Sequence, residues 1–239
     1  IQNTCHPQTI SVLKARAEPL GIKILSSTKP DNDTFGCLIQ NPDTFGEIHD
    51  LNSIIKSNKE QGILSVIISD LMSLVLMKSP GKFGADIVVG SAQRFGVPIG
   101  FGGPHAAFFA TKNEFKRLIP GRIIGVSIDR NNKRAYRMAL QTREQHIRRE
   151  KATSNICTAQ ALLAIISAAY AMYHGPKRLQ YIANTIHFNT QLLKKGLEKL
   201  GLEILSKDYF DTLLIKDTNK ADYWYKKSVD RGNNFRFVD

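Results

Sequence analysis

The sequence predicts an α/β fold in which parallel strands carry helices packed across them. Signals for helices and for strands alternate along the first hundred residues, and the strand-like runs are short and almost entirely apolar. Strands that are buried on both faces have this composition. With 239 residues, the chain is long enough for one large domain, or for one domain and the beginning of a second.

The first seventy residues alternate in a regular way. We expect a helix, two strands, a helix and a third strand, at residues 6–18, 22–25, 35–40, 51–61 and 63–69. The first helix places Ile10, Leu13 and Ala17 on one face. Asp50 is placed to cap the second helix, because its carboxylate can accept from the first free backbone N–H groups. The apolar run at 63–69 is typical of a fully buried strand.

Two further short strands are expected at residues 87–89 and 106–110. The loop between them contains Gln93 and is rich in glycine, which indicates turns and close backbone approach. After the second strand, Asn113 should cap a short helix whose inner side carries Phe115, Leu118 and Ile119.

Two helices are expected after residue 157, and a second domain after residue 200. The first helix, at 158–173, is apolar on most sides and should be buried; the second, at 177–200, is amphipathic. Its inner stripe consists of Leu179, Ile182, Ile186, Leu193, Leu197 and Leu200. Beyond it come a strand, a strand, a helix and a strand, at 202–205, 212–215, 220–230 and 235–238. We therefore predict a partial large domain at 1–200 and the truncated start of a small α/β domain at 201–239.

The ends of the chain suggest a piece of a longer protein, since it begins without Met and stops in a strand that lacks partners. The three cysteines, Cys5, Cys37 and Cys157, are far apart, so we expect no disulfide framework and no metal site. The longest apolar run, at 158–173, is shorter than the roughly 20 residues that cross a bilayer, so no membrane span is expected.

The net charge of +12 is concentrated, because half of it lies between Arg130 and Lys151, where eight Lys or Arg face two Glu. This patch could be a solvated face, a site for an anion or an acidic partner, or, least in keeping with the sequence, a nucleic-acid surface. The sequence shows no zinc finger, zipper or ribonucleoprotein strand to support the last interpretation.

Two residues stand where open α/β sheets present ligand-binding groups. Asp70 follows the strand at 63–69, and Gln93 follows the next strand along the chain. Each also has an ordinary structural interpretation, since Asp70 can cap a helix at 71–77 and the residues around Gln93 can form a polar turn.

Three longer stretches, at residues 84–110, 120–126 and 139–161, carry a family resemblance. The first contains Gly-Ser-Ala-Gln-Arg-Phe-Gly-Val-Pro, and the third contains Arg-Glu-Gln-His-Ile-Arg-Arg-Glu-Lys-Ala-Thr-Ser-Asn. Together they resemble the N-terminal half of the P-protein family of the glycine cleavage system, the glycine decarboxylases. Weaker similarity extends over nearly the whole chain. The resemblance implies a fold-type-I pyridoxal-phosphate transferase-like large domain, with a mainly parallel sheet between helix layers, in an enzyme built from two homologous halves.

Gln93 decides which half the chain resembles. In the catalytic half a His-Lys pair precedes Phe, whereas here Ala92 and Gln93 take that place. A carboxamide cannot form a Schiff base, because its nitrogen lone pair is delocalised into the carbonyl. The resemblance thus implies a non-catalytic half without catalytic residues of its own, and pyridoxal phosphate held covalently by the other half. Asp70 would suit the ring nitrogen of such a cofactor, and His105 could line the substrate channel.

Thr153 and Ser154, at the mouth of the first long helix, are our candidates for phosphate donors to the partner half, with plain N-capping as the alternative. His146 lies among arginines, where general-base work would be conceivable but has no support. Arg148 and Arg149 are expected to be structural or to attract an acidic surface, such as the lipoyl-carrying H-protein.

The resemblance implies that the complete enzyme decarboxylates glycine with pyridoxal phosphate and passes the aminomethyl group to lipoamide. It would work as a homodimer or heterotetramer, in the mitochondrial matrix of a eukaryote or the cytoplasm of a bacterium. Two other interpretations stay open. The chain could be an active enzyme that uses another lysine, such as Lys82, or a basic nucleic-acid-binding protein.

Overall fold

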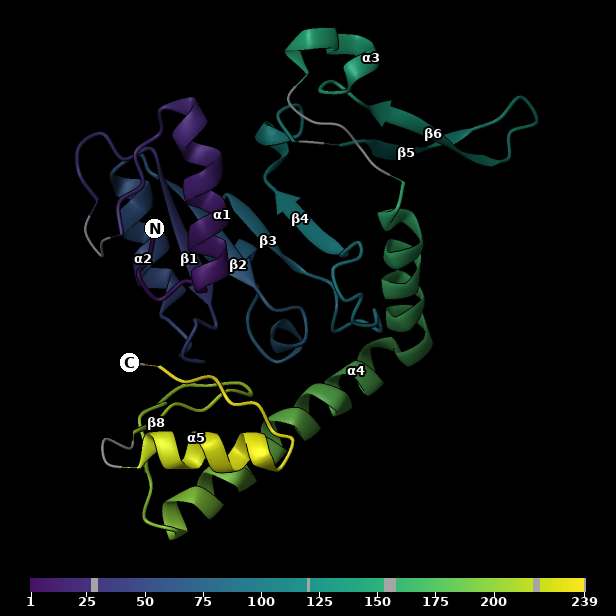
Figure 1. Cartoon of the computed structure of the whole chain (residues 1–239). Helices are drawn as coiled ribbons and strands as arrows, with labels where there is room; N and C mark the ends of the chain where they lie inside the picture. The colour runs from purple at the N-terminus through teal and green to yellow at the C-terminus, as the bar shows by residue number, and fades with distance from the viewer. Residues whose placement is uncertain (27–29, 120, 153–157, 217–219, 239) are drawn as a thin grey trace.

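The computed structural model describes the chain apart from residues 27–29, 120, 153–157, 217–219 and 239. Its centre is a four-stranded sheet with the order β1-β2-β3-β4, in which the first three strands are parallel and β4 is antiparallel to β3 (Figure 1). These strands are β1 (Gly36–Asn41), β2 (Leu64–Ser69), β3 (Ile87–Ser91) and β4 (Ala107–Thr111). The predicted α/β fold with a mainly parallel sheet is confirmed.

Helix α2 (Leu51–Glu60) packs on one face of this sheet. Its Leu51 and Ile55 join Ile39, Ile67 and Val88 in the main buried cluster. Burial of each such side chain contributes about 1.5–3 kcal/mol. The helix begins as predicted, because the Asp50 carboxylate accepts from two backbone N–H groups of its first turn.

Strand β2 is less buried than its composition predicts. Ser65, Ile67 and Ser69 are buried, but Val66 and Ile68 on the opposite face are only partly so. The expectation of a strand buried on both faces is therefore wrong for the described part of the chain, in which α2 packs on the face that carries Ile67.

The segment at 22–25 forms no strand, although helix α1 (Pro7–Ala17) precedes it as predicted. The Leu25 carbonyl instead accepts from the N-terminal ammonium of Ile1 at 2.6 Å. A strand needs a neighbour to satisfy its backbone groups, and no partner strand for this segment lies among the described residues.

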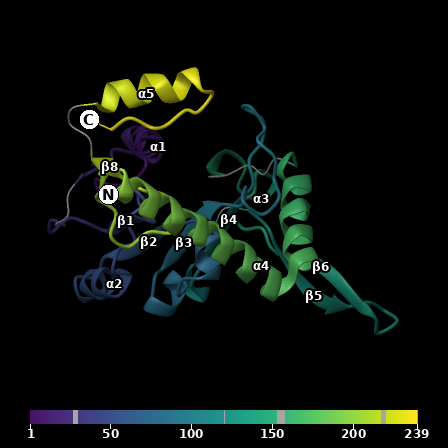
Figure 2. The same cartoon turned by 90° about the horizontal axis from the view of Figure 1, so that it is seen from below.

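A β-hairpin that the sequence analysis missed follows the central sheet. It consists of β5 (Ile123–Ile128) and β6 (Arg134–Leu140), and its turn is fixed by Asp129, whose Oδ1 accepts from the backbone of Asn131 and Lys133. Figures 1 and 2 show the hairpin at the opposite end of the molecule from the C-terminal segment. The helix expected after Asn113 is only a 3₁₀ turn, Asn113–Phe115, and Leu118 points outward rather than inward.

Helix α4 (Gln160–Lys199) joins the two predicted long helices across a kink. Gly175 has φ 63° and ψ 175°, outside the helical region, and Pro176 follows it, so the predicted break is confirmed. Before the kink, Leu163 and Ile166 pack against the loop around Gln93, but Ile165 and Met172 are 64% and 77% exposed. Within the described chain this helix is covered on one side only, contrary to the expectation of a buried helix.

Only part of the predicted stripe lies inward after the kink. Ile182 and Ile186 pack in a second cluster with Met72 and Phe210, whereas Leu193 and Leu200 are mostly exposed. The C-terminal segment holds a two-stranded antiparallel sheet and one helix, namely β7 (Glu203–Ile204), β8 (Ile215–Lys216) and α5 (Ala221–Asp230).

The strand expected at 235–238 does not form among the described residues. Its residues are exposed, and Arg236 donates instead to the backbone carbonyl of Thr44 at 3.1 Å. The short remaining elements are α3 (Gln145–Arg148) and the 3₁₀ turns Glu18–Leu20, Ser73–Val75, Pro80–Phe83 and Arg149–Lys151.

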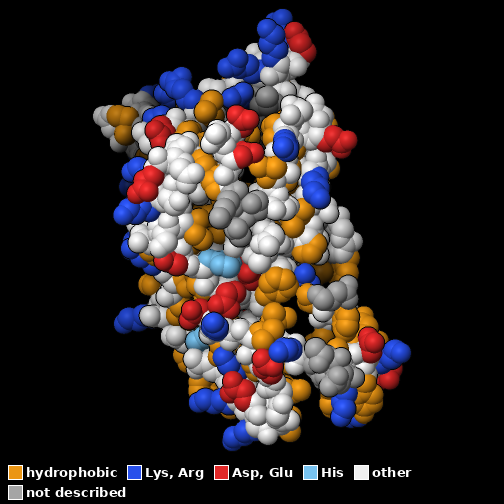
Figure 3. All heavy atoms as spheres, turned by 90° about the vertical axis from the view of Figure 1, so that its left-hand side faces the viewer, with side chains coloured by type: hydrophobic (Ala, Val, Ile, Leu, Met, Phe, Trp, Pro, Cys, Tyr) orange, Lys and Arg blue, Asp and Glu red, His pale blue; other side chains and the backbone are white. Residues whose placement is uncertain are grey.

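No helix in the described ranges is both long and apolar enough to cross a membrane. The same residues contain no group of three His, Cys, Asp or Glu side chains that could hold a metal ion. Cys5 and Cys37 are free thiols, while Cys157 lies outside the described part of the chain. On the face drawn in Figure 3, acidic and basic side chains are interspersed, with hydrophobic side chains exposed among them.

Candidate functional site

The carboxyl ends of β1, β2 and β3 meet at one edge of the sheet because these strands are parallel. Asn41, Asp70 and Ser91 stand at or directly after the ends of the three strands. Gly90 lets β3 approach β2 closely there, since a Cβ at this position would lie 2.0 Å from the Ser69 carbonyl oxygen. The sequence therefore brings its candidate residues to the edge where they were expected.

Asp70 caps the turn that follows β2. Its Oδ1 accepts from the backbone N–H of Met72 and its Oδ2 from that of Ser73, both at 3.2 Å. Burial raises the pKa of this carboxyl above its usual range, although the neighbouring Arg94 guanidinium opposes the shift. Asp70 thus accepts from the backbone as a cap does, but only the 3₁₀ turn Ser73–Val75 follows in place of the expected helix.

Arg94 forms an ion pair with the Asp70 carboxylate. Its Nη1 lies 3.2 Å from Asp70 Oδ2, and its Nη2 donates to Asp211 Oδ2. The guanidinium also lies 5.8 Å from the ring centroid of Phe210, a buried residue of the second hydrophobic cluster. One cation therefore bridges two carboxylates, of which Asp211 lies 117 positions after Arg94 in the chain.

Gln93 lies half-buried in the loop directly before Arg94. Its backbone N–H donates to Ser91 Oγ at 3.1 Å, and its carbonyl accepts from Val97 at 3.1 Å. His105 is exposed near the end of the same loop, beside Ala106, whose carbonyl accepts from Ala92. The loop is held by its own backbone and places both residues near the carboxyl end of β3.

These residues do not fit a covalently held pyridoxal phosphate. Such a site needs an amine for the aldehyde and a free carboxylate for the ring nitrogen. Gln93 offers only a carboxamide, and Asp70 is already paired with Arg94. Lys82 lies exposed in the turn before β3, and Lys112 pairs with Asp86 at 2.5 Å, so both lysines belong to the opposite edge of the sheet.

The C-terminal segment lies across the carboxyl edge of the sheet. The Glu47 carboxylate accepts from the backbone of Lys207 at 3.1 Å, and the backbone N–H of Ile48 donates to the Asp208 carbonyl at 2.8 Å. His187 of α4 holds the Phe210 carbonyl through Nδ1 at 2.8 Å. A cavity of about 590 Å³ remains beside this segment. It is lined by Ile48, His49, Asp50, His187, Gln191, Lys194, Lys207, Asp208 and Tyr209.

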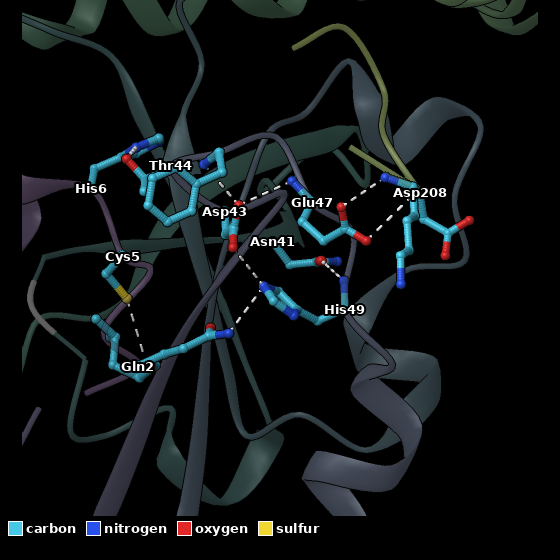
Figure 4. A network of polar contacts seen from close by, with 12 residues as sticks. Gln2, Cys5, His6, Asn41, Asp43, Thr44, Glu47, His49 and Asp208 are labelled. Carbon is cyan, nitrogen blue, oxygen red and sulfur yellow. Dashed lines mark hydrogen bonds and ion pairs between the residues drawn. The ribbon is translucent and has the colours of Figure 1, made fainter. Parts of the chain in front are cut away.

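A polar cluster after β1, drawn in Figure 4, was not predicted from the sequence. Asp43 Oδ2 lies 3.0 Å from His49 Nε2, which is also 3.0 Å from Gln2 Nε2, and Asn41 Oδ1 accepts from the His49 backbone at 2.8 Å. Burial alone would raise the pKa of Asp43. Hydrogen bonds from His49 and from the backbone of Phe45 and Glu47 outweigh that effect and lower it.

This cluster ties the N-terminus to the end of β1, next to the cis peptide between Asn41 and Pro42. Only the Asn-Pro-Asp-Thr run at 41–44 marked the region in the sequence, as part of the weaker family similarity. The partner Gln2, 47 positions from His49, was not recognisable, because contacts between distant residues leave no local pattern.

The basic region lies elsewhere in the molecule, with α3 at the top of Figure 1 and the C-terminal segment at the bottom. His146 is exposed and lies 3.1 Å from Gln141 Oε1, and Arg148 Nε donates to the Thr142 carbonyl at 3.2 Å. Glu144 is buried and pairs with Arg122 at 3.3 Å. Thr153 and Ser154 lie outside the described residues.

Solved structures with the same architecture show the fold class of this chain. The chain superimposes on a cysteine desulfurase from Thermococcus onnurineus NA1 with a TM-score of 0.61 and 16% identity, covering 98% of this chain and 60% of that one. An aspartate aminotransferase from Thermus thermophilus gives 0.61 and 16%, covering 97% and 65%. At this identity the likeness concerns the fold alone, which is that of fold-type-I pyridoxal-phosphate enzymes.

The sequence defines the family more narrowly. The profile of the glycine cleavage system P-protein matches residues 1–239, and the chain belongs to this family. Glycine dehydrogenase (decarboxylating) from Pelagibacter ubique (strain HTCC1062) is 52% identical over 242 residues, and that from Nostoc punctiforme (strain ATCC 29133 / PCC 73102) is 51% identical over 244 residues. Each match covers 100% of this chain but only 25% of the relative.

A crystal structure of glycine decarboxylase (P-protein) in inhibitor-bound form superimposes with a TM-score of 0.86 at 34% identity. The match covers 97% of this chain and 55% of that one. The family resemblance and the fold class predicted from the sequence are both confirmed. The chain spans about a quarter of the length of the curated relatives it matches.

Proposed function

We propose that this chain is part of the non-catalytic, supporting half of a glycine dehydrogenase (decarboxylating). The proposal rests on the residues at the carboxyl edge of the sheet. Gln93 stands there in place of the lysine that would hold the cofactor, and Arg94 forms an ion pair with the Asp70 carboxylate. The whole protein decarboxylates glycine with pyridoxal phosphate, which supplies an electron sink for the carbanion. The cofactor belongs to the other half, and this half contributes structure around it.

A partner half is supported by length and by surface. Three quarters of the relatives' length lies outside the match, which leaves room for a homologous catalytic half, fused or separate. In this chain several large apolar side chains of α4 are exposed, which marks a surface suited to protein contact. We propose assembly with that half, as a homodimer or heterotetramer, with the boundary of the small domain near residue 201.

Three single residues receive roles within this proposal. Thr153 and Ser154 would donate to the cofactor phosphate of the partner half, and His105 would line the substrate channel. His105 has the exposure that its role needs. In the whole protein, unchanged cofactor affinity after replacement of both hydroxyl residues by Ala would contradict the phosphate role, and an unchanged KM for glycine in His105→Ala would contradict the channel role.

Lipoylated H-protein is the proposed acceptor of the aminomethyl group, and the exposed basic surface of α3 and the following turn is the proposed docking site. Reversing Arg148 and Arg149 to Glu should raise the KM for H-protein about tenfold at low salt, because like charges then face an acidic partner. Added salt should raise the KM of the unchanged protein but not that of this variant, because in the variant salt screens a repulsion. The matched control is Lys56→Glu with Lys59→Glu, which makes the same charge change on α2. An equal rise in the KM for H-protein in the two double variants would show that only the net charge matters, and would contradict docking at α3.

The activity itself is tested with the whole protein that contains this chain. We expect release of CO₂ from carboxyl-labelled glycine that depends on lipoylated H-protein, and no loss of it in Lys82→Arg. Loss of activity in Lys82→Arg would favour an enzyme that uses this lysine. Steep salt-dependent binding of DNA or RNA, beyond that of a control protein of equal charge, would favour a nucleic-acid-binding protein. The proposed location is the cytoplasm in bacteria, to which the cited curated relatives belong, and the mitochondrial matrix in a eukaryote.

A further inference from the structure

We infer that Arg94 is a built-in cation that replaces a cofactor at this edge of the sheet and clasps the C-terminal segment onto it. The inference rests on the proposed function, because it explains how a half without its own cofactor keeps the vacated site closed. The clasp consists of Asp70, Arg94 and Asp211.

The charges on the two sides of Arg94 require such a cation. The Asp211 carboxylate acts on Asp70 as a neighbouring negative charge, and the two side chains are only 20% and 25% exposed. Two partly buried carboxylates repel each other unless a cation lies between them. The planar guanidinium of Arg94 offers one nitrogen to each, which a lysine ammonium could not do with the same geometry.

The surroundings fix the position of this cation. Phe210, directly before Asp211, is buried and lies under the guanidinium, and its carbonyl is held by His187 from α4. On the other side, Asp70 is held by the backbone of Met72 and Ser73. The clasp therefore joins the end of β2, the loop after β3 and the C-terminal segment.

Hydrogen–deuterium exchange of the whole protein tests the clasp. Arg94→Ala and Asp211→Asn should each speed exchange of the amides at 206–214 about five- to tenfold, and the double variant should be no faster than Arg94→Ala alone, because both changes break one interaction. The control is Arg130→Ala, which removes the same charge from the hairpin turn. Effects that add independently, or a change equal to that of the control, would overturn the clasp.

Covalent trapping tests the replacement of the cofactor. The whole protein carrying Gln93→Lys, with and without Arg94→Ala, is incubated with pyridoxal phosphate, reduced with borohydride, digested and mapped. We expect a phosphopyridoxyl group at position 93 in the double variant at a yield at least about fivefold that of the single variant, because only there is the Asp70 carboxylate free. Equal yields in the two variants would overturn this role of Arg94. Neither experiment depends on glycine decarboxylation, so failure here is distinct from failure of the proposed function.

Discussion

At the scale of single residues, the carboxyl edge of the sheet depends on a few close contacts. The role of Asp70 as a cap could be predicted, because capping is local and follows from a carboxylate at the end of a strand. Its pairing with Arg94 and the bridge to Asp211 could not, since 117 positions separate Arg94 from Asp211. The Asp43–His49 cluster was missed for the same reason, because its partner Gln2 comes from the far N-terminus.

Gly90 is the position where a single methyl group should do most damage. Gly90→Ala places a Cβ 2.0 Å from the Ser69 carbonyl oxygen and 2.6 Å from the ring of Phe108, so β2 and β3 must separate. We expect a loss of about 2–4 kcal/mol in the free energy of unfolding. Gly81→Ala is the control, because a Cβ there meets no atom within 4 Å. Thermal unfolding checks both, and an equal melting temperature in the two variants would contradict the close approach.

Asp43 should make the stability of β1 depend on pH. Its folded-state pKa is lowered, so its contribution is present above the ordinary pKa of an aspartate and is lost as the pH falls through the folded value. Asp43→Asn should lower the opening free energy of β1 amides by about 1–3 kcal/mol at neutral pH. That deficit should shrink below about pH 4.

Hydrogen exchange of the β1 amides at several pH values measures this difference. The exposed Asp33, in the loop before β1, provides the control through Asp33→Asn. A deficit in Asp43→Asn that stays constant with pH would show that the carboxylate charge is not the stabilising feature.

At the scale of elements, the regular parts of the fold were predictable and the irregular parts were not. Helices α1 and α2 and strands β1 to β4 follow from apolar periodicity, caps and glycines close to each element. The β5–β6 hairpin was not predicted, because its basic residues are equally typical of a charged surface patch, although exposed and partly buried positions alternate along β5. The strand expected at 235–238 does not form, because an extended segment needs a neighbouring strand to pair its backbone N–H and C=O groups.

The kink in α4 gives an element-scale prediction with a control of opposite sign. Gly175→Ala should destabilise by about 1–3 kcal/mol, because φ 63° with ψ 175° is strained for a residue with a Cβ. Gly196→Ala lies in the same helix at an ordinary helical position with open space around it, so it should stabilise by about 0.5–1 kcal/mol. Chemical denaturation compares the two, and stabilisation by both variants would mean that the kink is not required.

At the scale of the whole molecule, the exposed apolar surface is the main feature that the chain alone does not explain. The β5–β6 hairpin turns Val126 and Tyr136 outward as a cross-strand pair, and α4 exposes Met172 before its kink. The remaining three quarters of a protein of the relatives' length would cover such surfaces. We expect Met138 and Met172 to oxidise slowly with peroxide in the whole protein, and oxidation as fast as that of free methionine would contradict this.

The central claim is that this half supports a cofactor which it does not hold, and covalent mapping of the unmodified whole protein tests it most directly. The purified holoenzyme is reduced with borohydride, digested, and searched for peptides that carry a phosphopyridoxyl group. We predict one labelled lysine outside residues 1–239 and none within them. A labelled lysine within this chain, at Lys82 or elsewhere, would contradict the account.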